Sequence, residues 1–303
     1  MGEVDNSVMT GQMNIPEMGR DQPPTIGLFK KVMTVIQEDG YNILAWRIIW
    51  KFWTILCKLP GPRFIVFWRF TNVTRNIVTL KDALGFAFSR GFASIITPNQ
   101  VRSEIQALCE VILPVRPGTV LEIGTEHGGT FFLFSRVASA DAYLVSVDLP
   151  REDLKPWRAL CANLARSGQK VIAIDGDSHD RTTVEKVSCV LRHRRVDFLF
   201  IDGDHSYEGI RQDFENYATF LNEGAIVAFH DINPDHWTRF RKTTRAYSGG
   251  VHKFWDEVKV RYPHTEFIED PNEDGLGIGV LFIDRSRLNL DEAEREFQSS
   301  INH

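Results

Sequence analysis

One segment of the chain, residues 196–231, constrains the fold more than any other. It reads VDFLFIDGDHSYEGIRQDFENYATFLNEGAIVAFHD. A mostly apolar and aromatic run over 196–201 precedes an amphipathic stretch over 207–221, a turn-forming Asn-Glu-Gly at 222–224 and a second apolar run over 225–229. This order predicts a strand, a helix, a turn and a second strand. Parallel strands joined by a helix end at the same edge of a sheet, which is where open α/β sheets bind ligands.

Polar side chains follow both predicted strands. Asp202, Asp204 and His205 come directly after the first strand, and His230-Asp231 ends the second. Because both groups lie at the same edge of the sheet, we expect three acids and two histidines to converge on one crevice.

The bulk composition limits the class of protein. The 303 residues are enough for one large domain with an appendage, and a net charge of −5 argues against nucleic-acid binding. The four cysteines are widely spaced without a CxxC pair, and residues 1–25 are polar without an apolar signal core. We therefore expect a cytoplasmic protein, with residues 1–25 as a disordered tail.

Residues 26–94 are predicted to form a helical leader rich in basic and aromatic residues. Between Gly40 and Lys81 there is no Asp or Glu, and Arg47, Lys51 and Lys58 fall on one stripe of a helix. Two interpretations stay open. Segment 41–70 contacts a membrane interface, which would place the protein on the cytoplasmic membrane face, or it packs against the main domain or another copy in a homo-oligomer. Its composition also resembles the leaders of some cell-surface-glycan glycosyltransferases.

A glycine-rich loop follows an earlier predicted strand. Residues 119–138 read TVLEIGTEHGGTFFLFSRVA, which predicts a buried strand over 120–123, a turn at Gly124 and a helix over 130–137. The G-x-x-x-G-G spacing differs from the dinucleotide fingerprint and from the phosphate-binding P-loop. Glu122, near the end of the strand, suits a cationic or amine-bearing ligand.

Two further predicted strands also end in acids. The strand over 142–147 leads into Asp148, about 20 residues beyond the glycine loop, which is the position expected to bind ribose hydroxyls. The strand over 171–174 leads into Asp177 and Ser178, which suit an adenine amino group.

The runs VLEIGTEHGGT, VSVDLP, IAIDGDS, FLFIDGDHSYEGIRQDF and GAIVAFHDI together resemble the class I S-adenosylmethionine-dependent methyltransferases. The likeness covers residues 95–285 and is greatest to the branch that contains macrolide-sugar and rhamnosyl O-methyltransferases and cephalosporin-hydroxylase-like proteins. It implies a Rossmann-like α/β fold whose seven-stranded sheet has helices on both faces and an antiparallel last strand.

The resemblance also implies a site for S-adenosylmethionine over Gly124, with the ribose on Asp148. Together with the residue patterns, it predicts the following cofactor-binding set: Glu122, Gly124, Thr125, Gly128, Thr130, Asp148, Asp177, Ser178 and Asp202. Glu126-His127 stands where many class I enzymes have a further glycine.

A divalent metal is the second implied cofactor. Sugar methyltransferases of this branch resemble the present layout in having a metal triad, which here would be Asp202, His230 and Asp231. His205 corresponds to their general base, and Asp202 is the second predicted catalytic residue. Mg²⁺ prefers oxygen ligands and imidazole shifts the preference toward Mn²⁺, Fe²⁺ or Zn²⁺, so His230 alternatively contacts substrate in the absence of a metal.

The remainder of the chain is predicted in less detail. Residues 233–250 form a polar, basic loop whose Arg239, Arg241, Lys242 and Arg245 either face an anionic substrate or are solvated. A helix over 251–262 and a hairpin of 265–269 with 278–283 follow, and residues 286–303 form a tail.

These observations predict an O-methyltransferase that acts on a hydroxyl of a sugar, a glycolipid or a related small molecule. Two rivals remain: a metal-dependent hydroxylase-like enzyme on the same fold, and a non-catalytic, membrane-peripheral component of glycan assembly.

Overall fold

The computed structural model describes residues 59–89, 92–150, 155–244 and 246–284, together with Phe52 and Ile55. Several predictions fall outside these residues: the tail over 1–25, the first part of the 26–94 leader with Arg47, Lys51 and Lys58, the loop cation Arg245, and the 286–303 tail.

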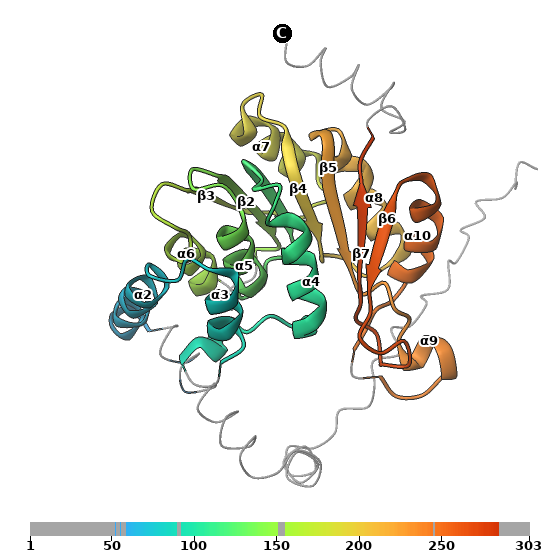
Figure 1. Ribbon diagram of the computed structural model, residues 1–303, viewed down its shortest axis with the longest axis horizontal. Coiled ribbons are helices and arrows are strands. Elements are labelled where there is room, and N and C mark those ends of the chain that lie inside the picture. The colour runs from blue at the N-terminus through green and yellow to red at the C-terminus, as the bar shows by residue number, and fades with distance from the viewer. Residues whose placement is uncertain are drawn as a thin grey trace, which may run out of the picture.

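The described strands form one twisted sheet of seven (Figure 1). They are β1 (Thr119–Ile123), β2 (Tyr143–Asp148), β3 (Lys170–Asp175), β4 (Val196–Ile201), β5 (Leu221–His230), β6 (His264–Phe267) and β7 (Ile278–Phe282). Their order is β3-β2-β1-β4-β5-β7-β6, with β7 antiparallel to both of its neighbours and the remaining pairs parallel. The predicted Rossmann-like methyltransferase sheet is therefore confirmed.

Helices cover both faces of this sheet. One face carries α2 (Pro60–Thr74), α3 (Leu80–Ala87), the 3₁₀ turn η1 (Phe92–Ile96), α4 (Arg102–Ile112), α5 (Gly129–Val137) and α6 (Lys155–Leu164). The other face carries α7 (Arg181–Leu191), α8 (Tyr207–Ala218) and α10 (Val251–Val258), which the 3₁₀ turn η2 (Lys259–Arg261) continues. A short helix, α9 (His236–Phe240), stands beyond the edge of the sheet (Figure 1).

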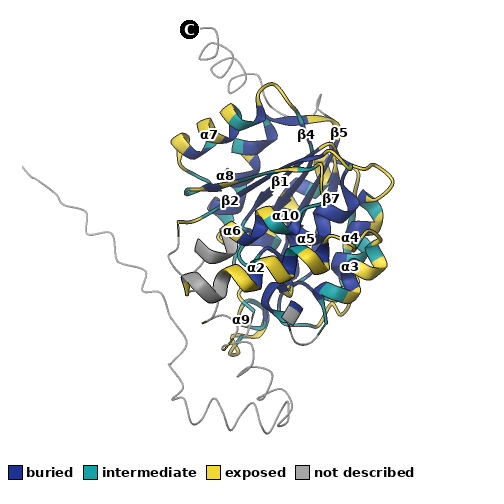
Figure 2. Ribbon diagram, turned by 90° about the vertical axis from the view of Figure 1, so that its left-hand side faces the viewer, coloured by how far each residue is buried: buried dark blue, intermediate teal, exposed yellow. Residues whose placement is uncertain are grey.

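Successive side chains of each strand point to opposite faces of the sheet, which produces two separate hydrophobic cores. In β4, Phe198 and Phe200 pack under α5, while Leu199 and Ile201 point to the α8 side. The described part of the leader joins the first core, because Val66 and Phe70 of α2 are buried in it (Figure 2). This part of the leader is thus packed onto the domain.

Some element boundaries differ from the predictions. The Asn-Glu-Gly at 222–224 lies inside β5 as a bulge, since the register with β4 jumps from Leu221 to Ile226 and Gly224 has φ +72°. The Pro60-Gly61-Pro62 run, expected to end a helix, lies in the first turn of α2, where proline is accommodated. The helix that it was expected to end lies outside the described residues.

Within the described part of the chain, no helix combines the length and the apolar character needed to cross a membrane.

Candidate functional site

The glycine loop after β1 is locked against the end of β4. Gly124 has φ +83°, and a Cβ at this position would lie 2.0 Å from the carbonyl oxygen of Asp202. The main chain is tied on both sides, because Gly124 donates to the Val147 carbonyl and Asp202 donates to the Ile123 carbonyl, each at 2.9 Å. Glycine is therefore required here by the neighbouring strand, whatever ligand the loop contacts.

Four of the predicted cofactor residues, Glu122, Thr125, Gly128 and Thr130, lie behind this loop and do not line the cavity in front of it. Thr130 donates to the Glu122 carboxylate at 2.5 Å, and the hydroxyls of Thr125 and Ser146 are 2.7 Å apart. Burial raises the pKa of Glu122 to about 8, against the opposing effect of the two threonines. In this structure Glu122 supports the loop from below.

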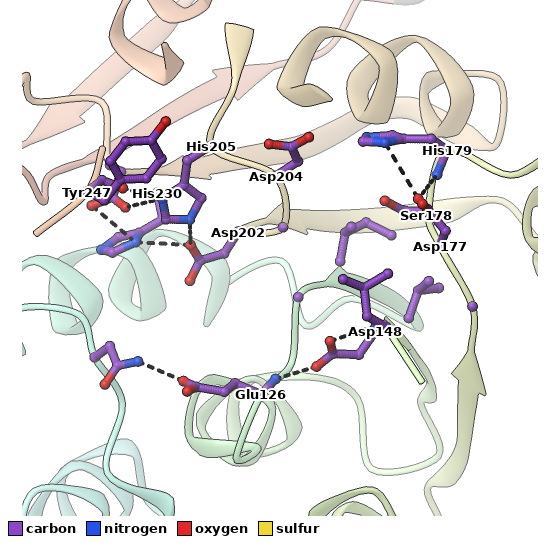
Figure 3. A pocket seen from close by; sticks show the side chains of 18 of the residues that line it. Glu126, Asp148, Asp177, Ser178, His179, Asp202, Asp204, His205, His230 and Tyr247 are labelled. Carbon is purple, nitrogen blue, oxygen red and sulfur yellow. Dashed lines mark hydrogen bonds and ion pairs between the residues drawn. The ribbon is translucent and has the colours of Figure 1, made fainter. Parts of the chain in front are cut away.

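A cavity of about 860 Å³ opens at the carboxyl ends of β1–β5 (Figure 3). It is lined by six acids and three histidines: Glu126, Asp148, Asp177, Asp202, Asp204, Asp231, His179, His205 and His230. The described lining includes neither Lys nor Arg. A cavity of this charge attracts cations and repels anionic ligands.

Asp148 is held at one end of the cavity by the main chain. Its two carboxylate oxygens accept hydrogen bonds from the amides of Glu126, at 2.7 Å, and Leu149, at 2.8 Å. Glu126 adopts a left-handed backbone, with φ +45°, and its carboxylate accepts a hydrogen bond from Asn99 at 2.7 Å. The departure at Glu126-His127 therefore shapes the loop so that one amide points at Asp148.

Asp177 and Ser178 line the same end, and α8 holds them in place. The Tyr217 hydroxyl donates to the Ser178 carbonyl at 3.0 Å, and Asp177 accepts from the His179 amide at 2.9 Å. The His179 ring lies 3.3 Å from the buried Asp213 carboxylate. The hydrogen bond to Asp213 raises the pKa of His179 to about 9, against the effect of burial.

Neither His179 nor Asp213 was predicted from the sequence to belong to the site. A signal for Asp213 exists in the sequence, because it falls with Ile210, Phe214 and Tyr217 on the apolar face of α8. An acid at such a position needs a partner.

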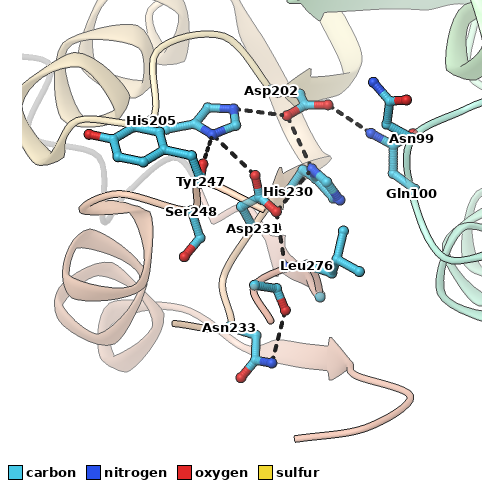
Figure 4. A network of polar contacts seen from close by, with 12 residues as sticks. Asn99, Gln100, Asp202, His205, His230, Asp231, Asn233, Tyr247, Ser248 and Leu276 are labelled. Atoms are coloured by element: carbon cyan, nitrogen blue, oxygen red, sulfur yellow. Dashed lines mark hydrogen bonds and ion pairs between the residues drawn. The ribbon is translucent and has the colours of Figure 1, made fainter. Parts of the chain in front are cut away.

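The other end of the cavity is formed by His205 and the acids around it (Figure 4). The His205 Nδ1 lies 2.5 Å from the Tyr247 carbonyl and 3.1 Å from Asp231 Oδ2, while Nε2 lies 3.5 Å from Asp202 Oδ1. A carbonyl oxygen only accepts, so Nδ1 carries a proton in either charge state and Nε2 gains or loses the second one. Burial opposes this protonation, but Asp202 and Asp231 raise the pKa of His205 to about 9.

Asp202 is oriented by three side chains. It accepts from Gln100 Nε2 at 2.7 Å, lies 3.1 Å from His230 Nδ1, and faces His205 on its third side (Figure 4). Burial would raise the pKa of Asp202, but the two histidines hold it well below its usual range. Gln100 gives no signal in the sequence, since its role arises only when the segment before α4 reaches the end of β4.

His230 departs from its predicted role as a metal ligand. Its Nδ1 is engaged with Asp202, and its Nε2, on the far side of the ring, is buried without a partner among the described residues. The donor atoms that converge belong instead to Asp202, His205 and Asp231, and they lie within 4.8 Å of one another. Asp231 reaches this group through a left-handed backbone, with φ +62°.

The loop before α10 completes this end of the cavity. The Tyr247 ring is exposed at the mouth and lies parallel to the His205 ring, with their centroids 6.3 Å apart. A Cβ on Gly249 would lie 2.2 Å from the His205 carbonyl oxygen, which also accepts from the Gly250 amide at 2.7 Å. The loop that contains Gly249 and Gly250 is therefore packed against and hydrogen-bonded to the main chain of His205.

The described basic residues of the 233–250 stretch do not face the cavity as one alternative predicted. Arg239 donates to the Pro271 carbonyl and to Asn233, while Arg241 and Lys242 lie over the rings of Trp237 and Phe240. These three cations are absent from the described lining, and the stretch contains the helix α9 instead of being loop throughout.

Comparison with known families identifies part of the chain. Residues 121–232, from β1 to just beyond β5, match the family described as "Methyltransferase domain". The match spans β1 to β5 of a sheet whose strand order is the one typical of class I, S-adenosylmethionine-dependent methyltransferases.

Two curated relatives carry the description "Uncharacterized protein". A protein of Sinorhizobium fredii is 24% identical over 176 residues, covering 54% of this chain and 17% of the relative. A protein of Acanthamoeba polyphaga mimivirus is 40% identical over 43 residues, covering 14% of this chain and 20% of the relative. The chain therefore spans a fifth or less of the length of these relatives.

Solved structures with similar folds include O-methyltransferases. One is from Bacillus cereus, in complex with SAH, at 16% identity and a TM-score of 0.48, covering 67% of this chain and 90% of that one. Another is TomG from Streptomyces achromogenes, in complex with SAM, at 16% identity and a TM-score of 0.46, covering 70% and 94%. Likeness at this level carries no argument about substrate.

Proposed function

We propose that the protein transfers the methyl group of S-adenosylmethionine to a hydroxyl of a sugar, a glycolipid or a related small molecule. The observation that carries this proposal is a single cavity with backbone-held acids at one end and His205 between two acids at the other. S-adenosylmethionine supplies a methyl group on a positively charged sulfur. The protein must bind this cation, orient the acceptor and remove the hydroxyl proton.

The cofactor end of the cavity fits this molecule in shape and charge. Asp148 offers carboxylate oxygens to the ribose hydroxyls, and Asp177 with Ser178 borders the space for the adenine. The acidic lining suits both a sulfonium and an ammonium group. The volume of about 860 Å³ lies in the range of ligand-binding cavities.

His205 is the group that would take the proton at the acceptor end. Its Nδ1 proton is held by the Tyr247 carbonyl, so the lone pair on Nε2 faces Asp202 and the cavity when the ring is neutral. Asp231, 3.1 Å from Nδ1, favours the imidazolium that forms when the acceptor loses its proton.

A divalent cation fits the same end. Asp202, His205 and Asp231 provide two carboxylates and one imidazole, a mixed set that suits Mn²⁺ as well as Mg²⁺. When bound there, a cation would lower the pKa of the acceptor hydroxyl. Both uses of His205 require Nε2, so His205 serves either as the base or as a ligand.

The acceptor that suits this cavity is neutral. Acids line the described surface, and the described cations of the 233–242 stretch are engaged elsewhere. An uncharged, hydroxyl-rich molecule avoids the repulsion that a phosphate would meet, and the Tyr247 ring at the mouth offers it a flat apolar surface. The earlier alternative of an anionic substrate is therefore not favoured.

The first test is titration calorimetry with S-adenosylhomocysteine. We expect one site per chain, and absence of heat at millimolar ligand would overturn the proposal. Radiolabelled S-adenosylmethionine is then supplied with neutral mono- and oligosaccharides, before and after dialysis against a chelator. Loss of transfer on dialysis and its recovery with Mn²⁺ would assign His205 as a ligand, whereas unchanged transfer would assign it as the base.

The hydroxylase-like rival requires a different set of donors. Non-haem iron oxygenases use two histidines and one carboxylate, whereas one histidine and two carboxylates converge here. Stoichiometric iron after anaerobic purification would nevertheless favour the rival.

A further inference from the structure

Helix α2 is apolar on two opposite sides. Val66 and Phe70, spaced four residues apart, are 2% and 0% exposed and pack into the first core. Phe64, Ile65 and Trp68 lie on the other side, where they are 73%, 65% and 63% exposed. At 100° per residue these three side chains share one face of the helix.

The outward direction of this face is fixed, because α2 is firmly docked. The Phe70 ring packs edge-on against Phe86 of α3, and the Thr71 hydroxyl lies 3.3 Å from Asn163 of α6. Arg136 of α5 donates to the Thr74 carbonyl at 3.3 Å. Figure 2 shows the exposed side of α2 facing away from the sheet.

Two basic residues lie next to the exposed apolar face. Arg69 and Arg75 are exposed beside it, and the chain contains no acid from Gly40 to Lys81 although its net charge is −5. An apolar and aromatic centre with a basic border is the pattern of a helix that lies in the plane of an anionic lipid surface. The 15 residues of α2 are too few to span a bilayer.

We infer that the exposed face of α2, formed by Phe64, Ile65, Trp68, Arg69 and Arg75, docks the protein onto an anionic lipid bilayer. A second copy of this chain fits the face less well. In a two-fold contact the same patch meets itself, which places the arginines of the two copies near one another, and the acid-free segment offers no carboxylate between them. This inference is independent of the proposed methyl transfer.

The test is flotation of the full-length protein with vesicles of phosphatidylcholine alone and with vesicles of phosphatidylcholine that contain roughly 30% of the anionic lipid phosphatidylglycerol. The wild type is expected to float only with the anionic vesicles. Combined Phe64→Ser, Ile65→Ser and Trp68→Ser substitutions should reduce the bound fraction about tenfold or more. Val260→Ser is the matched control, because Val260 is 76% exposed on η2 and lies outside this face.

A charge-reversal variant keeps the inference testable if the triple variant folds poorly. Arg69→Glu with Arg75→Glu should abolish flotation at low salt while leaving S-adenosylhomocysteine affinity unchanged. Lys186→Glu on the far face should change neither flotation nor affinity. Failure of the wild type to float, or flotation of either α2 variant at the wild-type level, would overturn the inference. A wild-type dimer that the triple variant converts to monomer, with no change in flotation, would overturn it in favour of self-association.

Discussion

The two ends of the cavity hold their acids by different means. At the cofactor end, Asp148 and Asp177 accept hydrogen bonds from backbone amides, so the main chain sets their orientation. At the acceptor end, Asp202 is held by the side chains of Gln100, His205 and His230. The cofactor end is therefore preorganised by the fold, while the geometry of the acceptor end depends on the ionisation of its histidines.

The two ends meet at one contact, where Gly124 passes the Asp202 carbonyl oxygen. A substitution at this contact should impair both cofactor binding and catalysis. A substitution within one end should impair only the property that this end supplies. Four substitutions test this division.

The largest effect is expected for Gly124→Ala. The added Cβ would approach the Asp202 carbonyl oxygen to 2.0 Å, and the backbone has φ +83°, so β1 and β4 must separate. We expect a loss of about 4 kcal/mol or more in the free energy of unfolding, measured by urea denaturation. Gly224→Ala is the control, because Gly224 has φ +72° but open space around it, and it should cost only about 1–2 kcal/mol.

His205→Ala should affect the acceptor end alone. Loss of the base or ligand is expected to lower kcat by about 10²–10⁴-fold, because His205 places one ring nitrogen 3.5 Å from Asp202 and the other 3.1 Å from Asp231, whereas the Nε2 atom of His230 is buried. Affinity for S-adenosylhomocysteine should stay within about threefold of the wild type. Equal losses in kcat and in cofactor affinity would show that the two ends are not separable.

Asp148→Ala should give the opposite pattern. Removing the carboxylate deprives the ribose of a charged acceptor, a loss of about 1.5–3 kcal/mol, so the Kd for S-adenosylhomocysteine should rise about tenfold or more. At saturating cofactor, kcat should change little. Asp148→Asn serves as a matched variant that keeps the shape and removes the charge, and calorimetry measures both.

The smallest effect is expected for His179→Gln, and it should depend on pH. His179 gains its proton more readily in the folded state, where its pKa is about 9, than at its unfolded value near 6.5. The contribution of His179 to the free energy of unfolding is therefore fully present below pH 6.5 and is lost as the pH rises through 9. Because the side chain is partly exposed, we expect a loss of about 1–2 kcal/mol at pH 6 and almost none at pH 10.

Urea denaturation of Asp213→Asn and of the double variant completes a double-mutant cycle for this pair. If His179→Gln lowers the free energy of unfolding by the same amount at pH 6 and at pH 10, the ion pair with Asp213 is not the cause of the loss.

Much of the fold followed from sequence patterns that local physics controls. The strand over 196–201 was predicted with the bounds of β4, because a mostly apolar run, interrupted only by Asp197, lies between Arg195 and Asp202. The convergence of Asp202, His205 and Asp231 also followed, since parallel strands end at one edge.

What the patterns could not predict depended on tertiary contacts or on single backbone angles. Adjacent residues of a strand ordinarily point to opposite faces. The left-handed φ of Asp231 breaks this alternation, so both side chains line the cavity and His230 Nδ1 lies 3.1 Å from Asp202 and 3.5 Å from Asp231. The bulge at Gly224 and the five-residue helix α9 are too short for periodicity to reveal.

The acidic lining of the cavity has a consequence for turnover. In the proposed reaction the sulfur of the cofactor loses its positive charge when the methyl group leaves, so the product is held less strongly by the six surrounding acids than the substrate was. The same electrostatic field that attracts the charged cofactor from solvent therefore binds the neutral-sulfur product less tightly. Methyl transfer itself thus favours dissociation of the product.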